Sequence, residues 1–502
     1  MTSRASTLVA ILLGTAGCMV GPNYRRPDVV TPPSWGELAP TAPPAGRSDA
    51  VIDGAPTAWW TTFDDQLLMS LIQRTVQSNL TLQQAEARVR EARASRRIAA
   101  ADLWPHAEAS GSYTRERTSK NGVSAGGAGK SFNLFQAGFD ANWEVDVFGG
   151  IRRSVEAADR SVEAAEDDRN AVLVSLMAEV GLEYVTYRSL QQRVALANQN
   201  VAAQQGTLDL TRRLFNAGLA SELDVQRAAA QVATTASSIP LLEQQAAQAM
   251  HGLSILIGQP PMVLQDELAP VGPIPKPPAQ VAVGLPSELL LRRPDVARSE
   301  RQLASQTAEI GVATRDLFPR FFLTGAAGLQ SLRTSDFFDW ESRVLSIGPS
   351  VFWPVFEGGR IRANIELQTA AQQELLAAYE AVVLQAFEDV EDALVAFSHE
   401  QATRAQLEEA VRANQRAAEL ARNLYAQGLT DFLTVLIAEQ SVFTSQDTLA
   451  QTERDVALEL VALYKAVGGG WEAAGMAGEV ADTGSFAQTK DRTASNGKED
   501  RQ

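Results

Sequence analysis

The chain has a single cysteine among its 502 residues, Cys18, close to its start. One cysteine can form neither an intrachain disulfide bond nor a thiolate metal site. The three histidines, His106, His251 and His399, are far apart in sequence, so a histidine-rich metal site is not indicated either. Basic residues are too few for a nucleic-acid-binding groove, because 44 Lys and Arg stand against 60 Asp and Glu, a net charge of -16.

Long apolar runs are also missing, and no stretch has the length and apolar character of a transmembrane helix. If the chain crosses a membrane, it must therefore cross as strands. No pattern singles out a nucleophile with its base, or a carboxylate pair. We accordingly expect neither an enzyme activity nor a cofactor.

Residues 1–17 have the features of a secretory signal peptide. Arg4 precedes the short apolar run Leu8–Leu13, and the small residues Thr15-Ala16-Gly17 stand directly before Cys18. Small residues before a cysteine resemble a bacterial lipoprotein signal, which predicts that Cys18 becomes the lipidated (palmitate-bearing) first residue. Met19 stands where inner-membrane lipoproteins carry Asp, which favours the outer membrane. The alternative is an ordinary secretion signal with a chance cysteine.

The chain contains an internal repeat with a spacing near 210 residues. The matched segments keep their order along the chain, which excludes a chance match. They are Trp104-Pro105 with Phe318-Pro319, Trp143 with Trp353, Leu214–Leu219 with Leu424–Leu429, and Gly258 with Gly468.

Each copy predicts the same order of elements. A helical stretch ends at an aromatic-Pro pair, because proline breaks a helix and makes its predecessor extended. Two strands, a very long helix and a return helix follow. The predicted helical stretches are 64–103 and 285–317, the strands 105–117, 132–147, 319–331 and 344–356, the long helices 151–215 and 360–425, and the return helices 221–257 and 431–467.

The two long helices carry an apolar residue at every seventh position, which predicts a left-handed coiled-coil seam. A helix of this length spans about 95 Å. On the helices alone, the pattern favours a coiled-coil rod. The row in the first copy is Leu173, Val180, Tyr187, Val194, Val201, Leu208 and Phe215; in the second it is Val383, Val390, Phe397, Arg404, Val411, Ala418 and Tyr425, broken only by Arg404.

The strands favour a membrane channel over a rod. In the second strand, Phe139, Ala141 and Trp143 alternate with the polar residues Asp140 and Asn142. About ten alternating residues per strand are typical of a transmembrane barrel, apolar outward and polar inward. Four strands cannot close a barrel, so several chains must share one, and three chains give twelve strands. Aromatic residues at the strand ends suit an interfacial belt; they are Trp104, Trp143, Phe318 and Trp353.

Four passages resemble the outer-membrane efflux factor (TolC-like) family, in its lipoprotein subgroup. They are Gly17–Tyr24 at the mature start, Leu285–Leu290 running into Arg292–Val296, Gly348-Pro349 leading to Trp353–Arg360, and Tyr425–Gln440. The resemblance implies a homotrimer with a β-barrel in the outer membrane and an α-helical barrel in the periplasm. It also implies a passive duct that receives its cargo from an inner-membrane pump through a periplasmic adaptor.

The resemblance further implies that the turns between long and return helices face the adaptor. The docking residues it predicts are Gly218, Leu219, Ser221, Gly428, Leu429 and Asp431. We expect an apolar gate formed by Leu433 and Leu436. Some relatives carry an acid and a base at the positions of Ile437 and Gln440, which this sequence lacks. The other candidate acids for the inner surface are Asp224 and Glu439.

The predicted organisation is a mostly helical chain with a small β part. Its segments are a signal peptide (1–17), a lipidated extended segment (18–63), repeat 1 (64–258), a linker (259–284), repeat 2 (285–470) and a disordered tail (471–502). Two other functions remain open at this point: an exit duct for protein secretion, and a periplasmic coiled-coil scaffold without a pore. The sequence does not indicate the cargo or the class of pump.

Overall fold

The computed structural model describes residues 19–36, 49–51, 56–121 and 129–473. The predicted signal peptide, Cys18 and residues 474–502 lie outside the described residues. The chain divides into two units. Unit 1 comprises residues 1–28, 88–166 and 298–380, and unit 2 comprises residues 29–87, 167–297 and 381–502.

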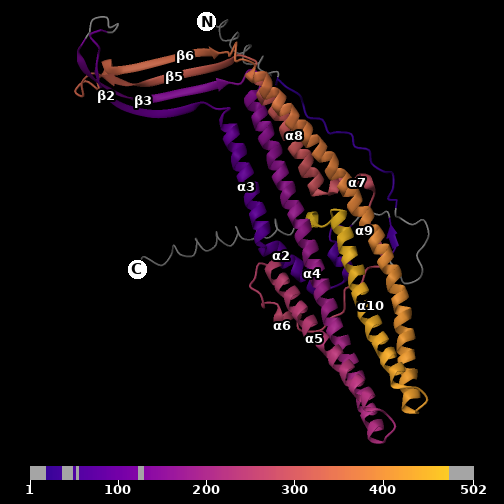
Figure 1. Cartoon of the computed structure of the whole chain (residues 1–502). Coiled ribbons are helices and arrows are strands. Elements are labelled where there is room, and N and C mark those ends of the chain that lie inside the picture. The colour runs from indigo at the N-terminus through magenta and orange to yellow at the C-terminus, as the bar shows by residue number, and fades with distance from the viewer. Residues whose placement is uncertain (1–18, 37–48, 52–55, 122–128, 474–502) are drawn as a thin grey trace, which may run out of the picture. The chain divides into compact units, whose positions relative to one another are not determined.

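Unit 1 contains a four-stranded antiparallel sheet with the strand order β2-β3-β5-β6 (Figure 1). The strands are β2 (His106–Arg117), β3 (Ser131–Val145), β5 (Arg320–Ser331) and β6 (Arg343–Phe352). Three of the four match the predicted ranges within two residues. The fourth ends at Phe352 and not at residue 356 as predicted, since Pro354 has no N–H to donate to a ladder.

The strand register places an apolar row, drawn from all four strands, on one face. Phe139 lies opposite Ala109 on one side and Ala327 on the other, and Ala327 in turn lies opposite Leu345. The neighbouring row, which includes Asp140, alternates to the other face. The alternation in the sequence therefore describes the sheet correctly.

The helices occur twice in the same order, which confirms the repeat. The first set is α2 (Gln66–Ser78), α3 (Leu80–Ala101), α4 (Gly150–Asn216) and α5 (Glu222–Leu256); the second is α7 (Pro286–Arg292), α8 (Pro294–Arg315), α9 (Arg360–Ala426) and α10 (Phe432–Ala466). Both long helices have 67 residues and both return helices have 35. These four helices match their predicted ranges within one residue.

The first helical stretch of each copy was predicted as one helix, and this prediction is wrong, because each is two helices. Asn79 is extended, and its side chain accepts hydrogen bonds from the N–H groups of Thr81 and Leu82, which caps α3. In the second copy Arg293 is extended because Pro294 follows it.

A glycine at the end of each return helix explains why both copies break at this point. Gly258 and Gly468 have φ angles of 68° and 75°. A Cβ atom at Gly258 would clash with the carbonyl oxygen of Ser78. A Cβ atom at Gly468 would lie only 3.0 Å from the Cα of Arg293. Each glycine thus lets the end of a return helix approach the break between the two shorter helices.

The heptad rows are largely buried within unit 2, as a coiled-coil seam requires. Val180, Val383 and Val390 are fully buried, and Phe397 nearly so. Phe215, the last member of the first row, departs from the prediction and is 41% exposed. It is the penultimate residue of α4, so little of the helical pair lies beyond it to cover it.

The segments outside the repeats are more structured than predicted. Residues 18–63 contain strand β1 (Asp49–Val51) and the 3-10 helix η1 (Trp59–Phe63), and the linker contains α6 (Gln265–Leu268) and β4 (Gln280–Ala282). Strand β1 pairs in parallel with β4. A second 3-10 helix, η2 (Trp340–Ser342), precedes β6. The predicted tail starts too early, because the Trp471 indole donates a hydrogen bond to the carbonyl of Arg292.

Among the described residues, no helix is both long enough and apolar enough to span a bilayer.

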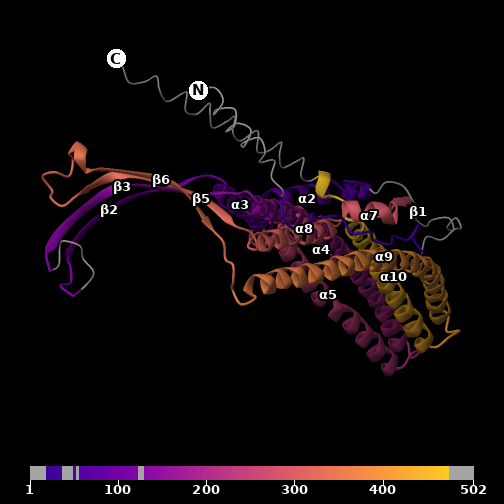
Figure 2. The same cartoon turned by 90° about the horizontal axis from the view of Figure 1, so that it is seen from above.

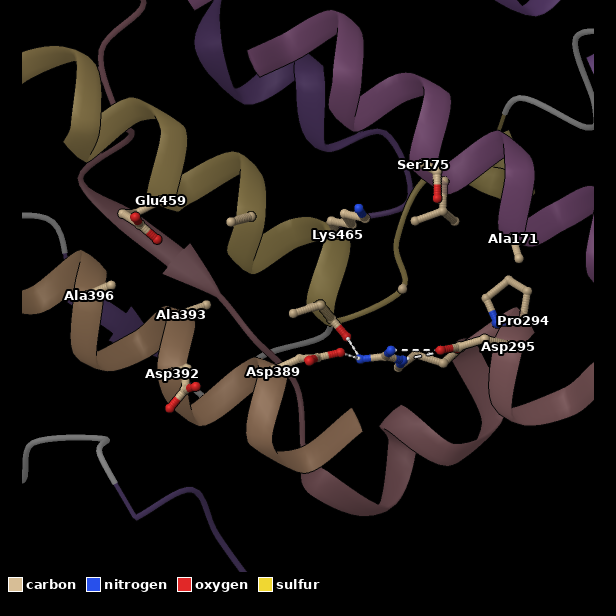
Figure 3. Close-up of a pocket in the computed structure, with 15 residues that line it drawn as sticks. Ala171, Ser175, Pro294, Asp295, Asp389, Asp392, Ala393, Ala396, Glu459 and Lys465 are labelled. Carbon is tan, nitrogen blue, oxygen red and sulfur yellow. Dashed lines mark hydrogen bonds and ion pairs between the residues drawn. The ribbon is translucent and has the colours of Figure 1, made fainter. Parts of the chain in front are cut away.

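A charged cluster in unit 2 holds the α7–α8 break in place. The guanidinium of Arg293 lies 2.7 Å from Asp295 and 2.8 Å from Asp389 of α9, and it donates a hydrogen bond to the carbonyl of Ala466 at the end of α10 (Figure 3, where Asp295 and Asp389 are labelled). Burial alone would raise the pKa of Asp295, but the hydrogen bond and charge of Arg293 outweigh it and hold the pKa below its usual value. One arginine thus joins three elements.

Removing this arginine should destabilise unit 2. We expect Arg293→Gln to lower the free energy of unfolding by about 1–3 kcal/mol, because two partly buried carboxylates lose their partner. Chemical unfolding of the purified protein measures the change. The matched control is Arg416→Gln, whose exposed pair with Glu419 should contribute less than about 1 kcal/mol.

The same cluster predicts an acid sensitivity. The folded pKa of Asp295 is depressed, so its contribution is fully present above the unfolded value of about 3.9 and is lost as the pH falls through the lower folded value. The stability difference between wild type and Arg293→Gln should therefore shrink as the pH drops below about 4. A difference that stays constant down to the acid limit would contradict this assignment.

Candidate functional site

The turns between long and return helices adopt the same conformation in both copies. Gly218 and Gly428 have φ angles of 73° and 72°. The next residue in each turn closes the helix end, since the N–H of Leu219 donates to the carbonyl of Leu214 and that of Leu429 to the carbonyl of Leu424. Glycine favours this left-handed position because it lacks a Cβ atom. The structure therefore confirms the predicted left-handed conformation of Gly218 and Gly428.

The return helices begin with side-chain caps at the two positions singled out in the sequence. Ser221 accepts a hydrogen bond from the N–H of Asp224, and the Asp224 carboxylate accepts one from the N–H of Ser221 in return. Asp431 accepts bonds from the N–H and the hydroxyl of Thr434, and the hydroxyl bond lowers its pKa. Asp224 thus caps the first return helix, and its place on the inner surface stays a prediction.

The two turns lie at one end of unit 2 (Figure 1), and each carries an exposed leucine. Leu219 is 76% exposed and Leu429 is 68% exposed. A Cβ atom at either Gly218 or Gly428 would meet no other atom within 4 Å. These turns are therefore open surfaces in the single chain, and their leucines are available to a partner.

An apolar cluster joins the two hairpins just behind the turns. We call it the tip cluster; its buried members are Leu208, Ala228, Ala421, Tyr425, Phe432 and Val435. The rings of Tyr425 and Phe432 meet edge to face with centroids 5.7 Å apart. Because the cluster draws on both long helices and both return helices, the two turns are held together.

The two predicted gate leucines have different surroundings. Leu433 is 45% exposed, whereas Leu436 packs against the tip cluster. Ile437 is 56% exposed. Leu433 and Ile437 are therefore free to meet other copies of the chain, while Leu436 contributes to packing within one copy.

Glu439 does not lie on an open surface, which corrects its interpretation as an acid of the inner surface. It is buried, and its Oε1 accepts hydrogen bonds from the Thr207 hydroxyl of α4 and from Nε of Arg422 of α9. The carboxylate thus forms an ion pair beside the tip cluster and ties the second hairpin to the first.

Among the described residues, the sheet of unit 1 is uncovered on both faces. Phe139 is 68% exposed, Leu345 80% and Ile347 78%, all three on the apolar face. Figures 1 and 2 show the four strands side by side with no other described element of unit 1 over either face. Within the described residues, the edge strands β2 and β6 each pair with only one strand. An uncovered apolar face with two open edges needs a further partner.

The aromatic residues at the strand ends repeat one hydrogen bond. The indole N–H of Trp143 donates to the carbonyl of Leu103, and that of Trp353 donates to the carbonyl of Leu317. These carbonyls immediately precede Trp104 and Phe318 in the chain. Each tryptophan therefore links the end of a strand to the aromatic-Pro corner that follows the shorter helix.

Comparison with known protein families identifies the family to which a chain with this sheet and these hairpins belongs. The model described as "Outer membrane efflux protein" matches residues 71–259 and 285–469, one segment in each copy of the repeat. The chain belongs to this family. Its members are outer-membrane channels of efflux systems, and family members form trimers.

Similar proteins span nearly the whole chain. The pyoverdine export outer membrane protein OpmQ of Pseudomonas aeruginosa is 33% identical over 476 residues, covering 94% of this chain and 98% of OpmQ. The toluene efflux pump outer membrane protein TtgF of Pseudomonas putida is 30% identical over 474 residues, covering 92% and 96%. The solved outer-membrane channel OprN has a TM-score of 0.84 and 36% identity, covering 90% of this chain and all of OprN.

The sequence pattern located the turns but missed the polar contacts behind them. The Thr207–Glu439–Arg422 contacts join residues up to 232 positions apart, and of the three only Glu439 lies in a passage that the sequence singled out. One signal was available: Arg422 and Glu439 lie on opposite arms of the second turn, 17 residues apart in sequence, so closure of the hairpin can bring them together. Thr207, from the other copy, gave no such signal.

Loss of the buried carboxylate should loosen the tips. We expect Glu439→Ala to speed hydrogen exchange in peptides covering 204–211 and 418–440 by about tenfold, because Arg422 and Thr207 lose a charged partner. Exchange mass spectrometry of the purified protein measures it. Glu419→Ala, which removes an exposed carboxylate from α9 three residues before Arg422, serves as the control. Equal exchange in the two variants would contradict a linking role for Glu439.

Proposed function

We propose that this protein is the passive outer-membrane duct of a tripartite efflux system, and that it exports small molecules handed on by an inner-membrane pump through a periplasmic adaptor. The observation that carries the proposal is the uncovered four-stranded sheet, borne on the same chain as a pair of long helical hairpins. The relatives OpmQ and TtgF are named for pyoverdine export and toluene efflux. Both names refer to small-molecule cargo, which favours efflux over protein secretion.

Three copies supply the missing partners of the sheet in this proposal. Strand β6 of one copy pairs with β2 of the next, so that twelve strands close with their apolar row outward. The polar row, which includes Glu108 and Asp140, then lines the lumen. A coiled-coil scaffold without a pore offers no reason for an exposed apolar row on Phe139, Leu345 and Ile347.

The turns are the proposed contact with the adaptor. Leu219 and Leu429 are exposed anchors on rigid, capped turns, which lowers the entropy lost on binding. A lipid on Cys18 is the proposed second attachment to the outer membrane, supported by the small residues that precede it. The energy for transport comes from the pump in this scheme, so the channel needs no catalytic residue.

Charging the turns should uncouple the channel without unfolding it. We expect a strain carrying Leu219→Asp and Leu429→Asp to become as susceptible to the cargo as a strain lacking the gene, because a buried charge opposes docking. Growth in graded cargo concentrations measures this, with the amount of assembled protein in the outer membrane checked in parallel. Val271→Asp, at an aliphatic residue 69% exposed outside the turns, is the matched control. Full resistance in the double variant would exclude the turns as the docking surface.

The closed state should depend on Leu433. We expect Leu433→Ser to raise single-channel conductance and the uptake of a bulky antibiotic, since the substitution removes an exposed apolar side chain from the predicted gate. Planar-bilayer recording measures the conductance. Leu436→Ser should instead lower stability, since Leu436 packs against the tip cluster. An unchanged closed state in Leu433→Ser would count against an apolar gate at this residue.

A further inference from the structure

The first described residues of the chain lie in a slot in unit 1, built around a buried arginine. Arg153 of α4 is only 1% exposed. Its guanidinium donates to the carbonyls of Val20 and Gly21, at 3.1 and 3.4 Å, and to Oδ1 of Asn23 at 2.7 Å. It also pairs with Glu156 at 2.7 Å. Three of these four acceptor atoms come from the N-terminal segment.

Arg153 depends on the N-terminal segment for most of its hydrogen bonds. A buried charge is costly unless its hydrogen bonds are satisfied. Glu156 neutralises the charge of Arg153, but residues 20–23 provide the other acceptors. Arg153 and the segment therefore stabilise each other.

Two glycines set the width of the slot. Gly311 of α8 has no side chain, and a Cβ atom there would lie 2.8 Å from Cγ of Arg153. Gly21 has a φ of 88°, and a Cβ atom on it would lie 2.5 Å from the Cα of Gly311. The stem of Arg153 and the backbone of Gly21 thus both lie against Gly311. A side chain on Gly311 would displace the stem of Arg153, and one on Gly21 would push the segment away from α8.

The segment is held at both ends of the slot. At one end, the N–H of Val20 donates to the carbonyl of Phe148, and Met19 lies against Gly149 at the start of α4. At the other end, the Tyr24 hydroxyl donates to Glu300 of α8 at 3.2 Å. The segment therefore has a fixed direction and a fixed starting point next to the end of β3.

The internal repeat shows that the slot is not a requirement of the fold. The start of α4 matches the start of α9 residue by residue, Ile151 with Ile361 and Arg152 with Arg362, but Arg153 matches Ala363. Counting back from the aromatic-Pro corners, Gly311 matches Arg97. The arginine and the glycine are thus both specific to the places where the N-terminal segment lies.

We propose that Arg153 and Gly311 form a dedicated slot that binds residues 19–24 of the chain itself and thereby fixes where a lipid on residue 18 is attached, one peptide bond from Met19 and beside the end of β3. The second half of this proposal rests on the proposed lipid anchor. Arg153 is a positioning residue in this scheme, since it acts on the anchor through the segment.

Hydrogen exchange of the full-length protein, purified from outer membranes in detergent, tests the slot. We expect peptides within residues 19–28 to exchange about tenfold faster in Arg153→Gln and in Gly21→Ala, because both release the Val20 amide from Phe148. Arg153→Lys, which keeps the charge but not the forked donors, should fall between wild type and Arg153→Gln. If Arg153→Gln does not assemble, Gly21→Ala still tests the slot, because it leaves α4 and α8 unchanged.

Two controls separate the slot from general loosening. Arg160→Gln removes another arginine of α4, one that pairs with Glu163. Gly36→Ala adds a methyl group further along the chain, in unit 2, where the nearest atom would be 3.6 Å away. Neither should change exchange in residues 19–28. Wild-type exchange in Arg153→Gln and Gly21→Ala, or equal acceleration in the controls, would overturn the proposal.

The lipid is measured separately by the mass of the N-terminal peptide. An acylated peptide with fast exchange in Arg153→Gln supports both halves of the proposal. An unacylated peptide in wild type would refute the lipid anchor of the proposed function and the second half of this inference. In that case the exchange rates alone would test the slot.

Discussion

A β-sheet cannot end at an open edge inside a lipid bilayer, because each unpaired N–H and C=O group there has no water to bond. The rest of this protein depends on that constraint. Its sheet has four strands, two open edges and an uncovered apolar row, so one chain cannot satisfy its own backbone in a membrane. Association of copies is therefore a condition for the sheet to exist in lipid, and the trimers formed by members of its family meet this condition.

The helical hairpins show how a duplicated sequence is adapted to such an assembly. Both copies keep the elements that every repeat needs: the tryptophan bond to the aromatic-Pro corner, the glycine at the end of the return helix and the left-handed glycine in the turn. The two copies differ at positions where only one of them contacts the N-terminal segment. Arg153 and Gly311 have no counterparts in the other copy, and both contact the N-terminal segment.

The sequence predicted the strands, long helices and turns closely because each has a local signature. Alternation of apolar and polar residues predicts a strand, and a heptad row predicts a coiled coil. Gly218 or Gly428, with the capping residue that follows, predicts a turn. The helix breaks at Asn79 and Arg293 also had local signals, a capping residue and the following proline, but the continuing helical pattern on both sides hid them. The burial of Glu439 and of Arg153 could not be predicted, since each depends on partners more than 100 residues away.

The central claim is that several copies of this chain close one pore. The most direct measurement is the native mass of the protein extracted from outer membranes in mild detergent, taken on the same preparation that is reconstituted into a planar bilayer. We expect a particle of three chains that conducts ions in discrete steps. A single chain, or a particle without conductance, would contradict it, because the edges of β2 and β6 would then be satisfied in some other way.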